Sequence, residues 1–308
     1  MSPSSEQLAR LLDPVDLDTF VSTYWERAAL YVAGSPDKFA DLFSLDTFFR
    51  SVALVDRADP RGPASGLYLK AGYEGIDGNH CEVLIQPEQI QPLLGAGLTI
   101  QAEHLETADP GLGALARSLK ETIRIASRVD IGGFLSPDRG GYGLHFDAPA
   151  MWILQIAGAK RWWYSPRPVL PFPLYNRVPT ADERKQGVGG LYREEDMQEQ
   201  LLRTGDVLYL PAGTWHRVQA AGQSLHLCLT VRPSNYLQLL SDVLSPLLLS
   251  LADWRHLPAP PAAPGDLDEM DPRLEALFAE RLLELRAAVG ALTAADLYRA
   301  WRDRARTV

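Results

Sequence analysis

The chain has 308 residues, of which 46% are hydrophobic and 22% charged; this is enough for one full catalytic domain and is typical of a globular protein. Its formal net charge of −9 argues against direct nucleic-acid binding and fits a basic protein or peptide partner better. The N-terminal sequence has no basic segment followed by an apolar one, and the apolar stretches are too short to cross a bilayer, so we expect a cytoplasmic protein without membrane spans.

Residues 1–60 are predicted to form a helical element that packs on the domain after it. Between Ser5 and Val52 the apolar residues recur at helical spacing, and Ser35-Pro36 resembles a helix start. We expect two or three helices in this stretch.

Residues 61–234 are predicted to form a β-domain. Three strand-like pieces, LYLKAGY, CEVLIQ and LTIQAEHL, precede a helix predicted over residues 111–125. From Val129 to Pro233 short strands alternate with Gly-Gly, Ser-Pro and Pro-Ala-Gly turns, which favours an antiparallel barrel or sandwich. Cys81 and Cys228 are far apart and in no metal-like spacing, so we interpret both as buried thiols.

Residues 235–308 are predicted to form a C-terminal helical region. Leu-rich helical sequence is followed by the Pro-rich linker LPAPPAAPGD and by two further helices. The surplus of apolar side chains predicts either a homodimer interface or packing within the chain. The residues concerned are Leu274, Leu277, Leu282, Leu283 and Leu285.

Two histidines and one aspartate carry the strongest chemical signal. His145 and Asp147 stand two residues apart, so on a strand their side chains point to the same face. His216 follows a Pro-Ala-Gly turn between two predicted strands and supplies a second imidazole. Two His and one carboxylate leave open positions on a metal, which suits Fe(II) oxygenases. Taken alone, a His-x-Asp pair occurs often by chance, and a lone buried His is usually a core residue.

Lys160 adds a cation fifteen residues after His145 in the sequence. A hairpin through Gly158-Ala159 would return Lys160 to the barrel interior, and the apolar strand WILQI before it favours that orientation over a surface lysine. Burying an unpaired Lys is strongly unfavourable, so an inward ammonium implies an anionic ligand. The distal carboxylate of 2-oxoglutarate is such an anion.

Together these motifs resemble the JmjC branch of the cupin superfamily, in particular the ribosomal-oxygenase-like group and its bacterial relatives. The similar segments include GGYGLHFD, WILQIAGAKRWWYSP and TGDVLYLPAGTWHRV. The resemblance implies an α+β, mainly β fold: a double-stranded β-helix barrel of the cupin or jelly-roll type, with N-terminal helices and a C-terminal helical region. It also implies Fe(II) as cofactor, held by His145, Asp147 and His216, and 2-oxoglutarate as co-substrate, held by Lys160.

Weaker candidates surround these motifs. By resemblance, Thr230 touches the co-substrate, and Tyr142 either bonds the same carboxylate or covers the barrel mouth. The family often carries Asn in the strand before the metal pair, where this chain reads Asp130-Ile131-Gly132-Gly133-Phe134, so a contact with co-substrate or substrate is expected to be missing. A further set either surrounds the metal and substrate pocket or packs in the core, namely His226, Trp152, Gln155 and Trp215. Three other histidines, His80, His104 and His256, are predicted to be structural or exposed.

The resemblance implies a 2-oxoglutarate-dependent dioxygenase that hydroxylates a side chain in a protein or peptide and releases succinate and CO₂. Demethylation and hydroxylation of a small molecule are alternatives within the same class. Two alternatives come from other classes: a catalytically silent metal-binding cupin, and a zinc or manganese hydrolase or isomerase that needs no 2-oxoglutarate.

Overall fold

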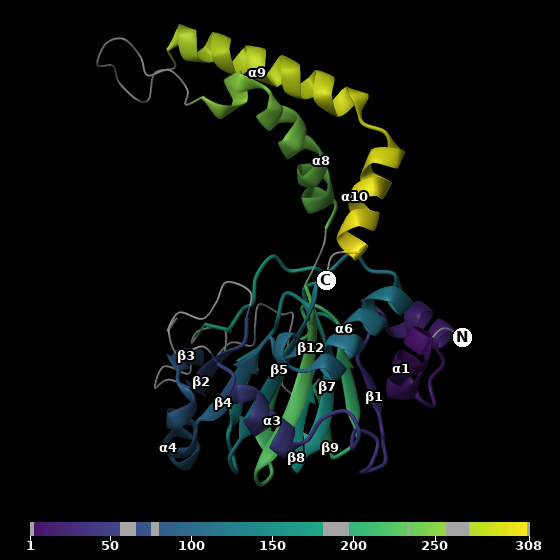
Figure 1. Ribbon diagram of the computed structural model, residues 1–308, viewed down its shortest axis with the longest axis vertical. Helices are drawn as coiled ribbons and strands as arrows, with labels where there is room; N and C mark the ends of the chain where they lie inside the picture. Colours follow the sequence, from purple (N-terminus) through teal and green to yellow (C-terminus); the bar gives the residue numbers. More distant parts are fainter. Residues whose placement is uncertain are drawn as a thin grey trace. The chain divides into compact units, whose positions relative to one another are not determined.

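The computed structural model describes residues 3–55, 66–74, 80–180, 197–232, 235–256 and 271–306. The chain divides into two compact units, Met1–Pro233 and Ser234–Val308 (Figure 1). The predicted domain boundaries at residues 60 and 234 and the Pro-rich linker at 257–266 lie outside the described residues. The three-part domain division therefore stays a prediction.

Two antiparallel sheets build the first unit (Figure 1). Among the described residues the larger sheet has the strand order β1-β10-β7-β12-β5-β4-β2-β3, and the smaller has the order β6-β11-β8-β9. The strands of the larger sheet are β1 (Leu30–Val32), β2 (Tyr68–Glu74), β3 (His80–Ile85), β4 (Thr99–Glu103), β5 (Val129–Ser136), β7 (Ala150–Ala157), β10 (Val207–Leu210) and β12 (Ser224–Val231). Those of the smaller sheet are β6 (Gly141–His145), β8 (Ala159–Tyr164), β9 (Gln198–Arg203) and β11 (His216–Ala220).

Side chains alternate between two hydrophobic cores because successive residues of a strand point to opposite faces. On β7, Met151 and Ile153 join a cluster between the two sheets, together with Trp162 of β8. Trp152 and Leu154 of the same strand belong to the main core on the other face of the larger sheet. The space between the sheets is the barrel interior, and the helices cover the main core.

The N-terminal helices are α1 (Pro3–Leu12), α2 (Leu17–Thr19), a π-helical turn (Phe20–Tyr24) and α3 (Leu45–Val52). They bury apolar side chains against the outer face of the larger sheet, so they cover the barrel rather than shape its interior. The buried residues they contribute to the main core include Leu8, Leu12, Phe20, Phe48 and Val52.

The helical expectation is wrong within this stretch at two places. Leu30–Val32 forms strand β1, which pairs with β10 and buries Leu30 and Val32 in the main core. Ser35-Pro36 leads into a series of turns rather than a helix. Burial and backbone pairing at the sheet edge outweigh helical spacing here, because propensity is a weak determinant beside tertiary contacts.

The larger sheet extends past the barrel through β4, β2 and β3, with a short 3₁₀ turn (Pro87–Gln89) and α4 (Ile90–Gly95) between β3 and β4. Helices α5 (Leu105–Ala108) and α6 (Pro110–Ile123) follow β4. Asp109 caps α6 by accepting a hydrogen bond from the backbone N–H of Leu112, and Pro110 occupies the first turn, as helix starts prefer. The helix predicted over 111–125 is therefore present.

The second unit contains α8 (Tyr236–Ser250), a 3₁₀ turn (Ala252–Arg255), α9 (Pro272–Ala291) and α10 (Ala294–Arg306). Arg304 of α10 pairs with Asp242 of α8. Among the described residues of this unit, Leu239 is the buried hydrophobic one, and many leucines face solvent. None of the described helices has the length and hydropathy that a membrane crossing requires.

The predicted fold class is confirmed. The strand pairs β5, β7, β10 and β12 on one side and β6, β8, β9 and β11 on the other form the two facing sheets of a double-stranded β-helix. N-terminal helices and a C-terminal helical unit accompany the barrel, as expected.

Candidate metal centre

His145, Asp147 and His216 come together at one end of the barrel. Antiparallel pairing sets His216, the first residue of β11, opposite His145, the last residue of β6. The Oδ2 atom of Asp147 lies 3.7 Å from Nε2 of His145 and 3.6 Å from Nε2 of His216. One ligand atom from each residue lies within 4.8 Å of the others, so the three side chains are arranged to hold one ion.

Backbone carbonyls orient both imidazoles. Nδ1 of His145 lies 2.8 Å from the carbonyl oxygen of Gly143, and Nδ1 of His216 lies 3.0 Å from that of Thr214. Each Nδ1–H therefore donates to the backbone, and each Nε2 faces the Asp147 carboxylate, where a metal would bind. Burial, reinforced by the charge of His145, lowers the pKa of His216 to about 4 against the opposing effect of Asp147, so His216 is neutral at pH 7.

Two aromatic residues that adjoin the ligands in sequence pack behind the ligand side chains. Phe146 and Trp215 pack edge to face, with ring centroids 4.8 Å apart, in a small core of their own. The backbone N–H of Gly213 donates to the carbonyl of Asp147 at 2.9 Å, which ties the two ligand segments together. Trp215, predicted either for the pocket or for packing, therefore packs behind the ligands and does not line the pocket.

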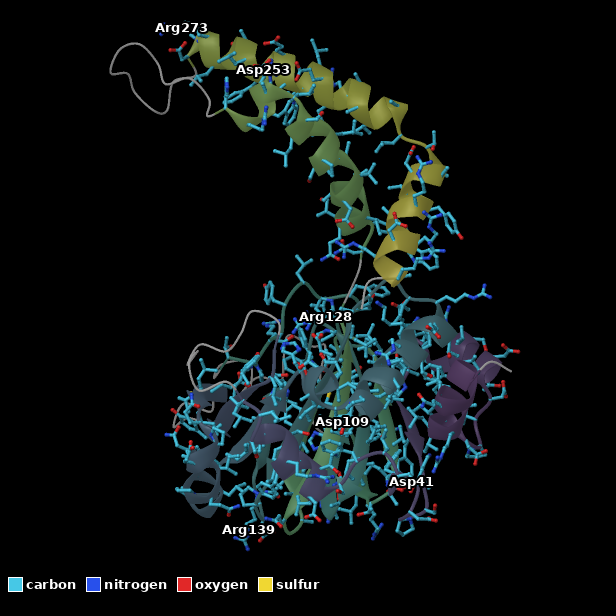
Figure 2. All side chains as sticks on the ribbon, in the orientation of Figure 1. Asp41, Asp109, Arg128, Arg139, Asp253 and Arg273 are labelled. Carbon is cyan, nitrogen blue, oxygen red and sulfur yellow. The ribbon has the colours of Figure 1, made fainter. Side chains whose placement is uncertain are left out.

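A second group of ligand-type atoms, from His104, Glu106 and Asp130, is already occupied by arginines. The guanidinium groups of Arg128 and Arg232 both pair with the Asp130 carboxylate. Arg128 begins the segment that leads into β5, at the end of the unit opposite Arg139 (Figure 2). A metal would have to displace these cations, so we interpret the group as a set of ion pairs that connects β5 to the end of β12. Asp130 thus pairs with two arginines, and His104 is structural as predicted.

Lys160 lies inside the barrel with its side chain fully buried. Its ammonium donates to Ser136 Oγ at 2.8 Å and lies 3.2 Å from Nδ1 of His226. No carboxylate of the described residues pairs with it, and burial lowers its pKa to about 7. The hairpin depends on Gly158, whose φ is +68° and where a Cβ would collide with the Gln223 carbonyl.

His226 lies beside the Lys160 ammonium, and Gln155 is the cross-strand neighbour of His226 on β7. The His226 ring stacks on Phe134 at 4.8 Å, and burial followed by the charge of Lys160 holds its pKa well below the ordinary value, so it accepts from Lys160 as a neutral ring. The Gln155 amide donates to Ser224 Oγ at 3.0 Å. Both residues face the interior, as the pocket interpretation required.

Trp162 is an interior residue that was not among the predicted site residues. Its ring stacks near His216 at 5.7 Å and meets His226 edge to face at 5.6 Å, so it lies between the metal ligands and Lys160. Its Nε1–H is buried without a hydrogen-bond acceptor among the described residues. The two-residue spacing from Lys160 on the same strand was the signal that could have identified it.

Tyr142 lies in the interior cluster with Trp162, and its ring meets Phe134 edge to face at 6.0 Å, whereas Thr230 lies farther along β12. The Tyr142 hydroxyl donates to Gln101 on β4 at 3.4 Å, and its ring covers Gly72 of β2. Thr230 lies four residues along β12 from His226, about 13 Å at the usual strand rise, with its hydroxyl 3.6 Å from the Cys228 sulfur. Contacts of these two residues with a co-substrate stay predictions.

Trp152 does not line the pocket. It is fully buried on the outer face of β7, where it stacks on Trp25 at 5.4 Å and packs against Phe20 and Tyr209. The pocket alternative for this residue is therefore wrong, because its position along β7 turns it toward the N-terminal helices.

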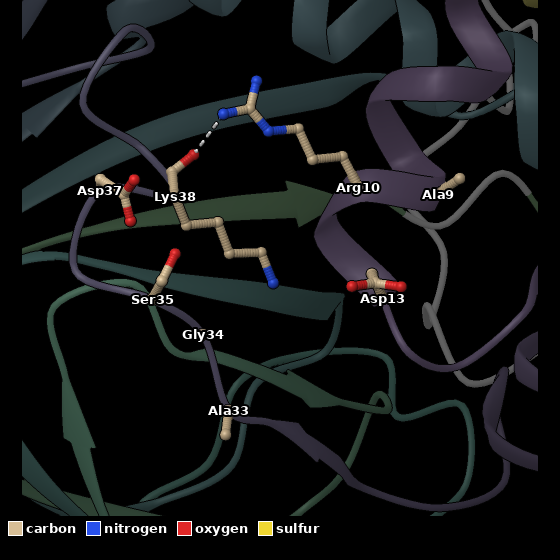
Figure 3. Close-up of a pocket in the computed structure, with 8 residues that line it drawn as sticks. All are labelled: Ala9, Arg10, Asp13, Ala33, Gly34, Ser35, Asp37 and Lys38. Atoms are coloured by element: carbon tan, nitrogen blue, oxygen red, sulfur yellow. Dashed lines mark hydrogen bonds between the residues drawn. The ribbon is translucent and has the colours of Figure 1, made fainter.

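A separate open pocket of about 590 Å³ lies between α1 and residues 33–38 (Figure 3). Arg10 donates to the Lys38 carbonyl at 3.1 Å, and the Lys38 ammonium donates to the Leu11 carbonyl at 3.0 Å, so both cations hold α1 in place. Asp13 and Asp37 also line the pocket and balance these charges. None of the predicted site residues lies here, and we assign the pocket a structural role.

Comparison with known proteins agrees with the sequence resemblance. Residues 114–239 match the family model described as the JmjC domain. The bifunctional lysine-specific demethylase and histidyl-hydroxylase NO66 of Drosophila willistoni is 25% identical over 258 residues, covering 80% of this chain and 31% of the relative. The uncharacterized protein YxbC of Bacillus subtilis is 23% identical over 262 residues, covering 81% of this chain and 78% of the relative. The chain thus spans about a third of the NO66 relative's length.

Solved structures share the fold. The Escherichia coli ribosomal oxygenase YcfD in complex with cobalt and 2-oxoglutarate aligns with a TM-score of 0.58 and 16% identity, covering 95% of this chain and 71% of that chain. Another YcfD structure aligns with a TM-score of 0.54 and 18% identity, covering 89% and 67%. The JmjC resemblance inferred from the motifs is confirmed, and these structures share its barrel.

We predict that the His145, Asp147 and His216 group binds one divalent ion and that the arginine-paired group binds none. His145→Ala and His216→Ala should each weaken Co²⁺ binding by more than about a hundredfold, since each removes one of three ligands. Anaerobic titration followed by visible absorption measures the affinity. His104→Ala is the matched control and should bind Co²⁺ like the wild type; the opposite pattern would assign the metal to the other group.

Proposed function

We propose that this chain, which carries a JmjC domain, is an Fe(II)- and 2-oxoglutarate-dependent oxygenase that hydroxylates a side chain of a protein or peptide. The observation that carries the proposal is the pairing of two features in one barrel. Three metal-type ligands meet at one end, and the buried ammonium of Lys160 lies farther in without a carboxylate partner among the described residues. A metal-chelating dianion would satisfy both.

The residues present fit both groups. His145, Asp147 and His216 would hold Fe(II) on one side and leave positions for further ligands. Lys160 would pair with the distal carboxylate of 2-oxoglutarate, and Ser136 would help to orient the ammonium. The unsatisfied Nε1–H of Trp162 offers a donor on the path between them. When bound, the iron and 2-oxoglutarate supply the oxidising power for C–H hydroxylation with O₂.

The distance between the two features also fits. Lys160 is paired with Ala220, four residues along β11 from His216, which is about 13 Å at the usual strand rise. The long lysine side chain shortens this gap, so a five-carbon dicarboxylate is a suitable size to bridge it. A zinc or manganese hydrolase would have no use for a buried cation at this place, which disfavours that alternative.

A protein substrate is supported by the names of the relatives. NO66 is described as a lysine-specific demethylase and histidyl-hydroxylase, and YcfD as a ribosomal oxygenase, so both act on macromolecules. We propose the same substrate class here, with hydroxylation as the reaction. Small-molecule hydroxylation is the second candidate within the same chemistry.

The central test measures turnover of 2-oxoglutarate. Wild-type protein with Fe(II), ascorbate and O₂ should convert 2-oxoglutarate to succinate, and a lysate incubated with it should gain oxygenated protein products by mass spectrometry. His145→Ala should abolish both. Under anaerobic conditions, Fe(II) and 2-oxoglutarate should produce a visible absorption band, which a silent cupin would lack. Absence of succinate, band and oxygenated product together would overturn the proposal.

Lys160→Met separates the ligand role from a structural role. It should raise the Kd for 2-oxoglutarate about 30-fold or more, the equivalent of about 2 kcal/mol, since it removes a buried charge pair with the ligand. It should leave the Tm of the ligand-free protein unchanged or raise it, because an uncompensated buried cation is lost. Unaltered affinity with a lower Tm would show that Lys160 only supports the fold.

Affinity for 2-oxoglutarate should depend on pH through Lys160. Burial lowers the pKa of this ammonium to about 7 in the empty barrel, and a bound carboxylate raises it again, so binding takes up a proton above pH 7. The Kd should be nearly constant below pH 7 and rise by up to about tenfold per pH unit above it. Anaerobic titrations of the metal-loaded protein with 2-oxoglutarate between pH 6 and pH 9 measure the Kd on both sides of this pKa. Lys160→Met should lose the slope; a wild-type Kd independent of pH would contradict it.

We also propose that the second unit forms a homodimer interface. Apolar side chains on α9 face solvent, with exposed fractions of 46% for Phe278, 53% for Leu282 and 64% for Leu283. Patches of this kind mark protein contacts. Light scattering should give twice the 34.0 kDa of one chain, and Leu282→Glu with Leu283→Glu should restore the single mass. Leu54→Glu, at an exposed leucine of the first unit, is the control; a wild-type monomer at micromolar concentration would exclude the dimer.

A further inference from the structure

Residues 165–180, here called the mouth loop, expose an unusual set of large apolar side chains. The loop follows β8, and its exposed fractions are 44% for Leu170, 65% for Phe172, 87% for Leu174 and 71% for Tyr175. Burial of large apolar side chains is favourable, so covering the four together would stabilise a complex strongly.

The start of the loop is held firmly against the turn that precedes the third metal ligand. The backbone N–H of Val169 donates to the Gly213 carbonyl at 3.0 Å, and Val169 packs with Phe146 and Trp215 behind the ligands. Gly213 has φ +76°, and a Cβ there would collide with the Leu170 carbonyl. The outward side chains therefore belong to a loop in tight contact with the barrel.

The far end of the loop is tied to the other ligand segment. Phe146 and Arg177 exchange two backbone hydrogen bonds of 3.0 Å, and the Asn176 side chain accepts from the backbone N–H of Ala148 at 2.8 Å. Phe146 and Ala148 flank Asp147 in sequence. Anything that binds the exposed side chains is thus brought beside the metal ligands.

The loop is also preorganised. Five of its residues are prolines, which restrict the backbone and reduce the entropy lost on binding, at positions 166, 168, 171, 173 and 179. Phe172 adopts a φ of +52°, a left-handed conformation that is unfavourable for a bulky residue. Strain of this kind is retained where the exposed orientation of a side chain serves binding.

We propose that the mouth loop is the docking surface for an apolar segment of the protein substrate, next to the side chain that reaches the metal. The identity of this occupant, a segment of a protein substrate, rests on the proposed function. The loop carries Arg167 and Arg177 and no acidic residue, so the segment should also carry a carboxylate beside its apolar residues. This local preference is opposite to the basic partner expected from the net charge of the whole chain.

The test selects peptides on the full chain without metal, so that it does not depend on oxygenase activity. Random phage-displayed peptides of about twelve residues are enriched on immobilised wild-type protein. Enriched peptides should contain at least two apolar residues and an Asp or Glu. Their Kd, measured by fluorescence anisotropy, should rise at least about tenfold in the variant Phe172→Ser with Leu174→Ser and Tyr175→Ser. The control variant Leu54→Ser with Val83→Ser, at exposed apolar positions elsewhere, should bind like the wild type.

Three outcomes would overturn the docking surface. In the first, the selected peptides bind the triple variant as tightly as the wild type. In the second, the selection enriches no sequence that is both apolar and acidic. In the third, the triple variant falls from dimer to monomer in light scattering, which would make a second copy of this chain the occupant. Succinate formation, measured separately on the same variants without added substrate, reports the proposed function. A loop that binds peptides in a protein that makes no succinate would leave docking intact and refute the oxygenase.

Discussion

The candidate site depends above all on the antiparallel pairing of β6 with β11. This pairing sets His145 directly opposite His216 and leaves Asp147 just past the strand end, with its carboxylate within 4 Å of both rings. A slip of one residue would turn either imidazole to the opposite face. Phe146 and Trp215 pack on that opposite face, so apolar burial behind the ligands holds the register that their chemistry needs.

The interior of the barrel holds a buried cation at a cost to stability. Among the described residues, the partners of the Lys160 ammonium are neutral, namely Ser136 and His226, and desolvation opposes its charge. A hydrophobic residue of similar size would suit the empty fold at least as well. The unsatisfied Nε1–H of Trp162 lies on the same path. Both features gain a physical reason once an anion occupies the barrel between the metal and the lysine.

The candidate metal centre and the proposed docking surface share the same backbone contacts. The mouth loop hydrogen-bonds to Gly213 on one ligand segment and to Phe146 on the other. A partner seated on the loop would therefore be positioned relative to the metal by two short connections, with little freedom to drift. This coupling accounts for rigid, proline-rich sequence at a place where a flexible polar loop would satisfy the fold.

The sequence by itself indicated antiparallel β-structure, a paired His145 and Asp147 and an inward Lys160, because these follow from local rules: two-residue spacing on a strand and the Gly158 turn before Lys160. The choice of a barrel over a sandwich rested on the resemblance to the JmjC branch. Only the tertiary structure decided which face of a strand is inside. Trp152 and Trp162 look alike in sequence, yet one packs under the N-terminal helices and the other lies between the ligands and Lys160. Strand β1 and the pairing of Arg232 with Asp130 likewise depend on partners about 180 and 100 residues away, which no local pattern encodes.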